Sequence, residues 1–153
     1  AANFLFNIIA DIDYEKAQML VIKKSSDALV SGGHIYIDYG YTLHPENWFA
    51  NANETVVWQG TDSNGNTGKM ALLDSSFDSK TGLNKFIRRF ELLLSDGTEI
   101  RQDIPSTKHF ATLEQIHQWL EDAGFIVEEE YGDYRRNPIR ETTNRAIIWA
   151  RKM

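Results

Sequence analysis

The sequence has 153 residues, 42% of them hydrophobic and 25% charged, which is typical of one globular domain with a hydrophobic core. There are 16 Lys and Arg against 22 Asp and Glu, and the net charge of −6 argues against nucleic acid or a membrane surface as a partner. The absence of cysteine excludes a disulfide framework and a cysteine-based zinc site, and it is compatible with a cytoplasmic location.

The first forty residues predict a strand, a helix and a second strand. Residues 4–9 form an almost unbroken apolar run, which is typical of a strand buried on both faces. Asp11 to Asp13 can cap the helix that follows. Helical spacing over residues 14–29 is shown by Ala17, Leu20, Val21, Ala28 and Leu29. Gly32 and Gly33 end this helix, because glycine can adopt the left-handed conformation of a C-cap. Residues 35–39 then predict a second buried strand.

The middle of the chain has a different character and predicts an antiparallel sheet. Residues 41–53 form a loop rich in aromatic and amide side chains. Turn-forming residues at 62–68 and the pair Asp96-Gly97 are hairpin signals. The predicted strands are 55–58, 70–73, 86–94 and 98–104.

The last forty residues predict a helix between two strands. Thr112 and Gln115 have the spacing of a capping box, and the helix they begin ends at Gly124. Its apolar face consists of Leu113, Ile116, Leu120 and Ala123. A strand begins at residues 125–127, a polar loop follows, and residues 146–150 form the final strand.

Three of these segments, in this order, resemble class I S-adenosylmethionine (SAM)-dependent methyltransferases. Residues 29–38 resemble the family's L-x-x-G-G turn into its fifth strand. Residues 110–125 resemble its late helix and the Ala-Gly-Phe entry to its sixth strand, and residues 146–151 resemble its seventh strand. Residues 4–9 would then be the end of the fourth strand.

The resemblance implies an α/β fold, namely half of a Rossmann-like methyltransferase sheet with strands equivalent to 4-5-7-6. It implies that residues 1–153 are a single domain, the C-terminal part of a methyltransferase domain. Residues 42–110 would be an antiparallel insert that covers the substrate pocket, as in glycine and sarcosine methyltransferases. The family's glycine-rich cofactor loop would precede Ala1, so we expect the isolated chain to be inactive. We expect a missing N-terminal half or self-association through the bare edge of the first strand.

The function implied by the resemblance is transfer of a methyl group from SAM, in the complete protein, to a small-molecule acceptor. Such an enzyme aligns the two reactants and excludes water, so no catalytic triad is expected. The 4 histidines have no metal-ligand spacing. Two alternatives remain, a standalone α+β ligand-binding or interaction domain without catalysis and a complete enzyme of another class.

Candidate site residues follow the predicted strands, because open α/β sheets bind ligands at the carboxyl ends of their strands. The resemblance places Asn7 beside SAM; otherwise it is a hydrogen-bonded loop amide. Asp38 either binds a substrate amine or caps a backbone turn. Tyr39 and Tyr41 follow it, and their hydroxyls could orient the acceptor.

Further candidates lie in the middle of the chain and near its end. His44 and Trp48 either cover the pocket or pack within their loop. Arg88 and Arg89 alternate faces on a strand, so one of them, with Arg89 as the candidate, could bind a substrate carboxylate through two hydrogen bonds. The alternative is a solvated face. A polar cluster that either contacts substrate or lies on the surface consists of Tyr131, Asp133, Tyr134, Arg135 and Arg136.

Overall fold

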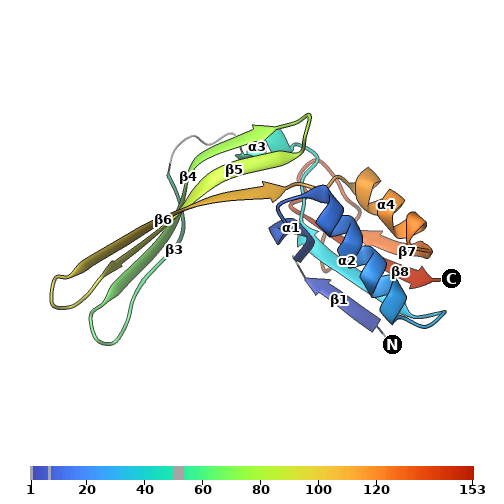
Figure 1. Ribbon diagram of the computed structural model, residues 1–153, viewed down its shortest axis with the longest axis horizontal. Coiled ribbons are helices and arrows are strands. Elements are labelled where there is room, and N and C mark those ends of the chain that lie inside the picture. The colour runs from blue at the N-terminus through green and yellow to red at the C-terminus, as the bar shows by residue number, and fades with distance from the viewer. Residues whose placement is uncertain (1, 7, 50–53) are drawn as a thin grey trace. The chain divides into compact units, whose positions relative to one another are not determined.

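The structure, a computed structural model, describes the backbone of residues 2–6, 8–49 and 54–153 (Figure 1). Asn7, the predicted cofactor-binding residue, lies outside the described residues. The chain divides into two compact units, residues 1–45 with 108–153, and residues 46–107. The predicted organisation as a single domain with an insert at 42–110 stays a prediction.

The first unit holds a four-stranded sheet and most of the helical residues. Its elements are β1 (Ala2–Phe6), α1 (Ile8–Asp11), α2 (Glu15–Ala28), β2 (His34–Gly40), α4 (Leu113–Asp122), β7 (Phe125–Tyr131) and β8 (Arg145–Lys152). The strand order is β1-β2-β8-β7. β1 is parallel to β2, whereas β8 is antiparallel to both of its neighbours. Three of the strands therefore point the same way, and the predicted α/β fold is confirmed.

Helices α2 and α4 cover one face of this sheet (Figure 1). Successive strand residues point to opposite faces, and Ile35, Ile37 and Tyr39 of β2 face the helices. They pack with Ile22 of α2 and Ile116 of α4 in one buried cluster. The other face of the sheet carries the groove described below.

The predicted first helix is correct in extent but wrong in its cap and its buried face. Its N-cap is Tyr14, which makes no side-chain capping bond, and the Asp residues before it do not serve as the cap. Gln18 and Ser26 are buried on α2, whereas Leu20 is 52% exposed. The polar pair can be buried because each side chain donates a hydrogen bond to a backbone carbonyl.

The beginning of α1 and the end of α2 also differ from the predicted pattern. Ile8 and Ile9 belong to α1 rather than to the first strand, and Ile9 is fully buried. The cap that ends α2 is Leu29 in an extended conformation, while Gly32, with φ of 76°, lies in the turn that follows. Lys152 Nζ on β8 donates to the carbonyls of Ser26 (2.7 Å) and Leu29 (2.8 Å). Its ammonium group therefore satisfies carbonyl groups at the C-terminal end of α2, where a positive charge is favourable.

The predicted capping box of α4 is confirmed. Thr112 Oγ1 accepts from the Gln115 backbone N–H (3.2 Å), and Gln115 Oε1 accepts from the Thr112 N–H (2.9 Å). Gly124, with φ of 81°, follows the helix and adopts the left-handed conformation expected there.

The second unit holds an antiparallel sheet with the order β3-β4-β5-β6, as the turn signals predict. Its elements are α3 (Pro45–Phe49), β3 (Thr55–Thr61), β4 (Thr67–Asp78), β5 (Leu83–Leu93) and β6 (Glu99–His109). Gly97, with φ of 87°, lies in the turn between β5 and β6, where Asp96 accepts a hydrogen bond from the Thr98 N–H. In the part of the chain that the structure describes, no helix is long and apolar enough to cross a membrane.

Candidate functional site

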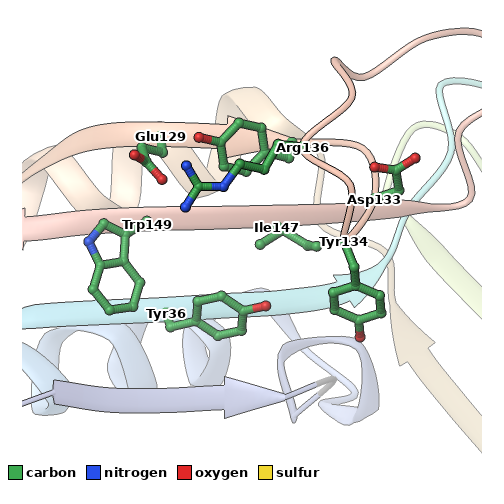
Figure 2. A pocket seen from close by; sticks show the side chains of 8 residues that line it. Tyr36, Glu129, Asp133, Tyr134, Arg136, Ile147 and Trp149 are labelled. Carbon is green, nitrogen blue, oxygen red and sulfur yellow. The ribbon is translucent and has the colours of Figure 1, made fainter.

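A groove lies on the face of the first unit's sheet that the helices leave uncovered (Figure 2). Its volume is about 430 Å³. It is lined by Tyr36, Glu129, Tyr131, Asp133, Tyr134, Arg136, Ile147 and Trp149. Strands β2, β7 and β8 and the loop after β7 therefore build one site. Tyr36 of β2 is more than ninety residues away in the sequence from the other lining residues.

Aromatic rings on neighbouring strands form the floor of the groove. Tyr36 and Trp149 face each other across β2 and β8, with ring centroids 5.9 Å apart and planes at 67°. His34 stacks on Trp149 at 5.0 Å, and its Nε2 lies 3.1 Å from Glu128 Oε2. Arg151 Nε donates to the other oxygen of Glu128 at 2.6 Å, and this bond holds the pKa of that carboxyl below its usual value. The indole ring of Trp149 is therefore held in place by contacts within the protein.

Asp38 lies beneath one end of the groove, near the carboxyl end of β2. It is 1% exposed, and its Oδ2 accepts a hydrogen bond from Tyr134 Oη at 2.6 Å. Its Oδ1 accepts from the guanidinium of Arg145, which also lies 4.8 Å above the Tyr134 ring. The bond to Asp38 raises the pKa of Tyr134, so the phenol stays protonated at neutral pH and acts as a donor.

Asp133 organises the loop that forms the groove's upper wall. Its Oδ1 accepts from the backbone N–H groups of Arg135 (2.8 Å) and Asn137 (3.0 Å), and its Oδ2 accepts from Asn137 Nδ2 (2.7 Å). Arg136 adopts φ of 63° in this turn and places its guanidinium carbon 5.5 Å above the Tyr131 ring. The loop is therefore preformed by its own hydrogen bonds.

Sequence reasoning placed Asp133 in a polar cluster but missed its role in shaping the loop. The same Asp-x-x-x-Asn spacing occurs at Asp62 and Asn66, in the turn between β3 and β4. There Asp62 Oδ1 accepts from the N–H groups of Asn64 (2.8 Å) and Asn66 (2.9 Å), and Oδ2 accepts from Asn66 Nδ2 (2.9 Å). Reading the two segments together would have indicated the turn.

Tyr39 and Tyr41, two predicted site residues, lie on the helix-covered side of the sheet. Their ring centroids are 5.8 Å apart, and Tyr41 stacks on Phe110 at 5.7 Å. The Tyr39 hydroxyl is buried and has no hydrogen-bond partner among the described residues. Burial raises the pKa of Tyr39 well above its usual value.

The other predicted site residues are spread over both units. His44 Nε2 lies 2.5 Å from Glu141 Oε2 in the first unit. Trp48, 44% exposed, and Arg89 belong to the second unit. Arg89 donates through Nε and Nη2 to the two oxygens of Asp103, each at 2.7 Å. The bidentate geometry that was predicted to bind a substrate carboxylate therefore already binds Asp103.

The two glycines of the turn after α2 make their hydrogen bonds within the chain. The backbone N–H groups of Gly32 and Gly33 donate to the carbonyls of Lys152 and Val30, each at 2.9 Å, so neither is directed at a ligand. Among the residues that the structure describes, no group of three or more His, Asp or Glu side chains is placed to hold a metal ion.

Comparison with known proteins identifies the fold. No family model matches the sequence, and no curated protein matches it. The structure is similar to a SAM-dependent methyltransferase from Clostridium acetobutylicum, with a TM-score of 0.71 and 15% identity over 99% of this chain and 56% of that one. It is also similar to SAM-bound CalS10, an amino pentose methyltransferase from Micromonospora echinaspora, with a TM-score of 0.70 and 12% identity over 99% and 58%.

A third similar structure is the sugar N-methyltransferase KedS8 from Streptoalloteichus, with a TM-score of 0.69 and 14% identity over 99% of this chain and 56% of that one. These similarities show that the chain has the fold of part of a SAM-dependent methyltransferase. It spans little more than half the length of the structures it matches, 56% to 58% for these three.

Proposed function

We propose that the protein containing this chain is a SAM-dependent methyltransferase that acts on a small molecule, and that this chain supplies the acceptor side of its active site. The observation that carries the proposal is the fold, in which an antiparallel β8 lies between two strands of like direction. The structural similarity to methyltransferases over 99% of the chain supports it. The alternative, a standalone binding domain, has no structural neighbour among these comparisons that favours it.

The acceptor that fits the groove best is an amine-bearing sugar or a molecule of similar shape. CalS10 acts on an amino pentose and KedS8 on a sugar nitrogen. The flat faces of Tyr36 and Trp149 can pack against the apolar face of a sugar ring. The carboxylate of Glu129 on β7 also lines the groove, where it can attract an ammonium group (Figure 2).

This chain's residues would orient the acceptor and exclude water, since bound SAM already supplies an activated methyl group. Tyr134 offers a hydroxyl whose orientation Asp38 fixes. Asp38 acts in this scheme through Tyr134 and Arg145, because both of its oxygens already have partners. The remaining predicted site residues stay proposals, namely Asn7 for the cofactor and Tyr39, Tyr41, His44, Trp48 and Arg89 for the substrate.

SAM binding is proposed to need polypeptide in addition to the residues described here. The edge strand β1 pairs only with β2 among the described residues, and its other edge is available to a further strand. That strand would come from an N-terminal half of the same protein or from a second copy of the chain. The cytoplasmic location also stays a prediction, based on the absence of cysteine.

The test is calorimetric titration of S-adenosylhomocysteine into the 153-residue chain and into a longer polypeptide that adds N-terminal sequence. We expect no binding to the chain alone and clear binding to the longer form, which should also methylate an amino sugar. Binding by the chain alone would show that our account of the cofactor site is wrong. A longer form that neither binds nor methylates would contradict the proposed function and favour the binding-domain alternative.

A further inference from the structure

The outward face of α2 carries apolar side chains where a surface helix is normally polar. Met19 is 39% exposed and Leu20 is 52% exposed, whereas the polar Gln18 and Ser26 of the same helix are buried. A helix that covers a sheet usually turns its apolar side chains inward and its polar ones to solvent. The core of the first unit therefore does not account for Met19 and Leu20, whereas a ligand that contacts them would.

These two side chains line a groove between α2 and α4, which we call the helix groove. Its volume is about 430 Å³. On α2 it is lined by residues that share one side of the helix, Lys16, Met19, Leu20 and Lys23. On α4 and its C-cap it is lined by Trp119, Asp122 and Ala123. Trp119 is only 5% exposed, so its indole lies at the bottom of the groove.

Hydrogen bonds at both ends hold the two walls of the helix groove in place. Gln115 Nε2 on α4 donates to Glu15 Oε1 on α2 at 3.2 Å. Ser26 Oγ on α2 donates to the backbone carbonyl of Ala123, the C-cap of α4, at 2.7 Å. The two helices therefore run side by side in the same direction (Figure 1). The shape of the groove is fixed by contacts within the chain.

The charges around the helix groove favour an anionic group at the Lys16 end. Lys16 is exposed and forms no ion pair among the residues that the structure describes. The carboxylate of the preceding Glu15 is engaged by the hydrogen bond from α4. At the other end, Lys23 pairs with Asp27 at 3.8 Å, and Asp122 adds a negative charge. An anion is therefore attracted to Lys16 more strongly than to the end where Asp122 lies.

The size of the helix groove favours a small ligand over a protein partner. Lys16 and Lys23 bound it on α2, and the helix between them rises by about 10 Å. A partner helix about 10 Å wide would cover roughly 100 Å² of plane over that length, far below the roughly 800 Å² per partner of a stable protein interface. A volume of about 430 Å³, in contrast, lies within the range of about 300–1,000 Å³ that is usual for small-molecule sites.

We propose that the helix groove binds a small amphiphilic carboxylate. The ammonium group of Lys16 binds the carboxylate of the ligand. The apolar part of the ligand packs on Met19, Leu20 and Trp119, and the flexible thioether of Met19 adapts to its shape. The aliphatic stem of Lys23 covers the far end of the ligand. This site lies on the helix-covered side of the sheet and the proposed acceptor groove on the other, so the ligand is not the methyl acceptor.

The test is a titration of the isotope-labelled 153-residue chain with decanoate, below its micelle-forming concentration, followed by NMR. We expect saturable shifts of amides in α2 and α4, with a dissociation constant of about 1 mM or below. Each methylene added between hexanoate and decanoate should tighten binding by about 2- to 4-fold. Decylammonium, which has the opposite charge, should bind more weakly. Saturable shifts confined to the second unit, or no saturable shifts at all, would overturn the inference.

Three variants separate the head group from the apolar contact. Lys16→Glu should weaken decanoate binding by about 10-fold or more and make decylammonium the tighter ligand. The matched control is Lys24→Glu, the same charge change on the same helix at a side chain that is 70% exposed and outside the groove, and it should change affinity by about 2-fold or less.

Leu20→Ser should weaken both probes by about 5-fold, because it removes apolar contact area and no charge. Leu20 is exposed, so the circular dichroism of the wild type should be retained. Wild-type affinity for decanoate in Lys16→Glu would refute the assigned head-group site. Equal losses in Lys16→Glu and Lys24→Glu would show attraction to the general charge of α2 and would also count against the proposal.

Discussion

Asp38 illustrates how a charge is kept beneath a ligand-sized groove. A carboxylate that is 1% exposed has lost its hydration, which costs free energy unless donors in the protein replace the water. Tyr134 and Arg145 supply those donors, and the guanidinium stacks on the phenol ring. The three side chains therefore support one another, and removing one leaves the other two in altered positions.

Asp38→Asn should lower the free energy of unfolding by about 2 kcal/mol, because Arg145 loses its buried partner but can partly regain water. Urea unfolding at neutral pH measures this. Asp27→Asn is the control, since Asp27 pairs at 3.8 Å with Lys23 on the exposed surface, and it should change stability by about 0.5 kcal/mol or less. Equal effects of the two substitutions would contradict the structural role of Asp38.

Tyr39→Phe tests the buried hydroxyl. No described residue accepts or donates to it, so its removal should leave stability at pH 7 unchanged or slightly higher. Because the folded-state pKa of Tyr39 is raised, the phenol ionises first in the unfolded chain, so the wild type keeps its stability below the usual tyrosine pKa of about 10 and loses stability as the pH rises above it. Urea unfolding at pH 7 and pH 10.5 should show the wild type losing more stability than the variant. A clear loss of stability in the variant at pH 7 would mean that the hydroxyl has a partner.

At the scale of single residues, the sequence predicted Asp38 as a candidate site residue but not the side chains that contact it. Asp38 could be identified because it ends an apolar strand. Its partners Tyr134 and Arg145 are 96 and 107 residues away, and only the antiparallel placement of β8 brings them near. The location of Tyr39 could have been read from the alternation of Ile35, Ile37 and Tyr39, which places all three on one face of the strand.

Helix α2 is held by a polar contact where an apolar one would be expected. Gln18 Nε2 donates to the carbonyls of Ile9 (2.7 Å) and His109 (2.9 Å), and its Oε1 lies 2.6 Å from His109 Nδ1. Burial lowers the pKa of His109, so its imidazole is neutral at pH 7 and can donate to the amide oxygen. One side chain thereby joins α1, α2 and the end of β6.

Gln18→Leu should destabilise the chain by about 1–3 kcal/mol although it makes the core more hydrophobic, because buried backbone carbonyls and the His109 ring lose their partner. Chemical denaturation provides the measurement. Gln118→Leu on α4 is the matched control, since that glutamine bonds to Asp122 on the exposed surface at 3.0 Å. A more stable Gln18→Leu variant would show that the network is not needed for folding.

The two long helices differ in how much of them the sequence predicts. Both bounds of α4 follow from local chemistry, a capping box and a glycine, and both are confirmed. The buried face of α2 depends on Gln18 and Ser26, whose partners Ile9, His109 and Ala123 are distant or outside the helix. A pattern of apolar residues cannot show that a polar side chain is buried with its bonds satisfied.

For the whole molecule, the two units differ in how their apolar surface is covered. The first has a continuous core between sheet and helices, whereas few residues of the second are buried. Local stability follows the number of buried contacts, so amide hydrogen exchange should be slower in β2 and β8 than in β4 and β5. Equal exchange rates in the two sheets would contradict this difference.

The strand order of the first unit was implied by the family resemblance alone, because apolar runs and turn signals indicate where strands lie along the chain but not which strands are neighbours in the sheet. The antiparallel sheet was accessible from its hairpin signals alone. The groove was not, because it forms where Tyr36, Trp149 and the loop after β7 meet in space. Which surfaces remain uncovered can be seen only once the layers are assembled.

The turn built by Asp133 separates the residues that hold the loop from those that are displayed on it. Asp133 and Asn137 make the internal hydrogen bonds, while the side chains of Arg135 and Arg136 take no part in them and are exposed. Arg135 can therefore be replaced without loss of the backbone shape, and Arg136 by residues that tolerate its φ of 63°. A descendant of this protein could change what it recognises in a few substitutions, since the scaffold would tolerate the intermediates.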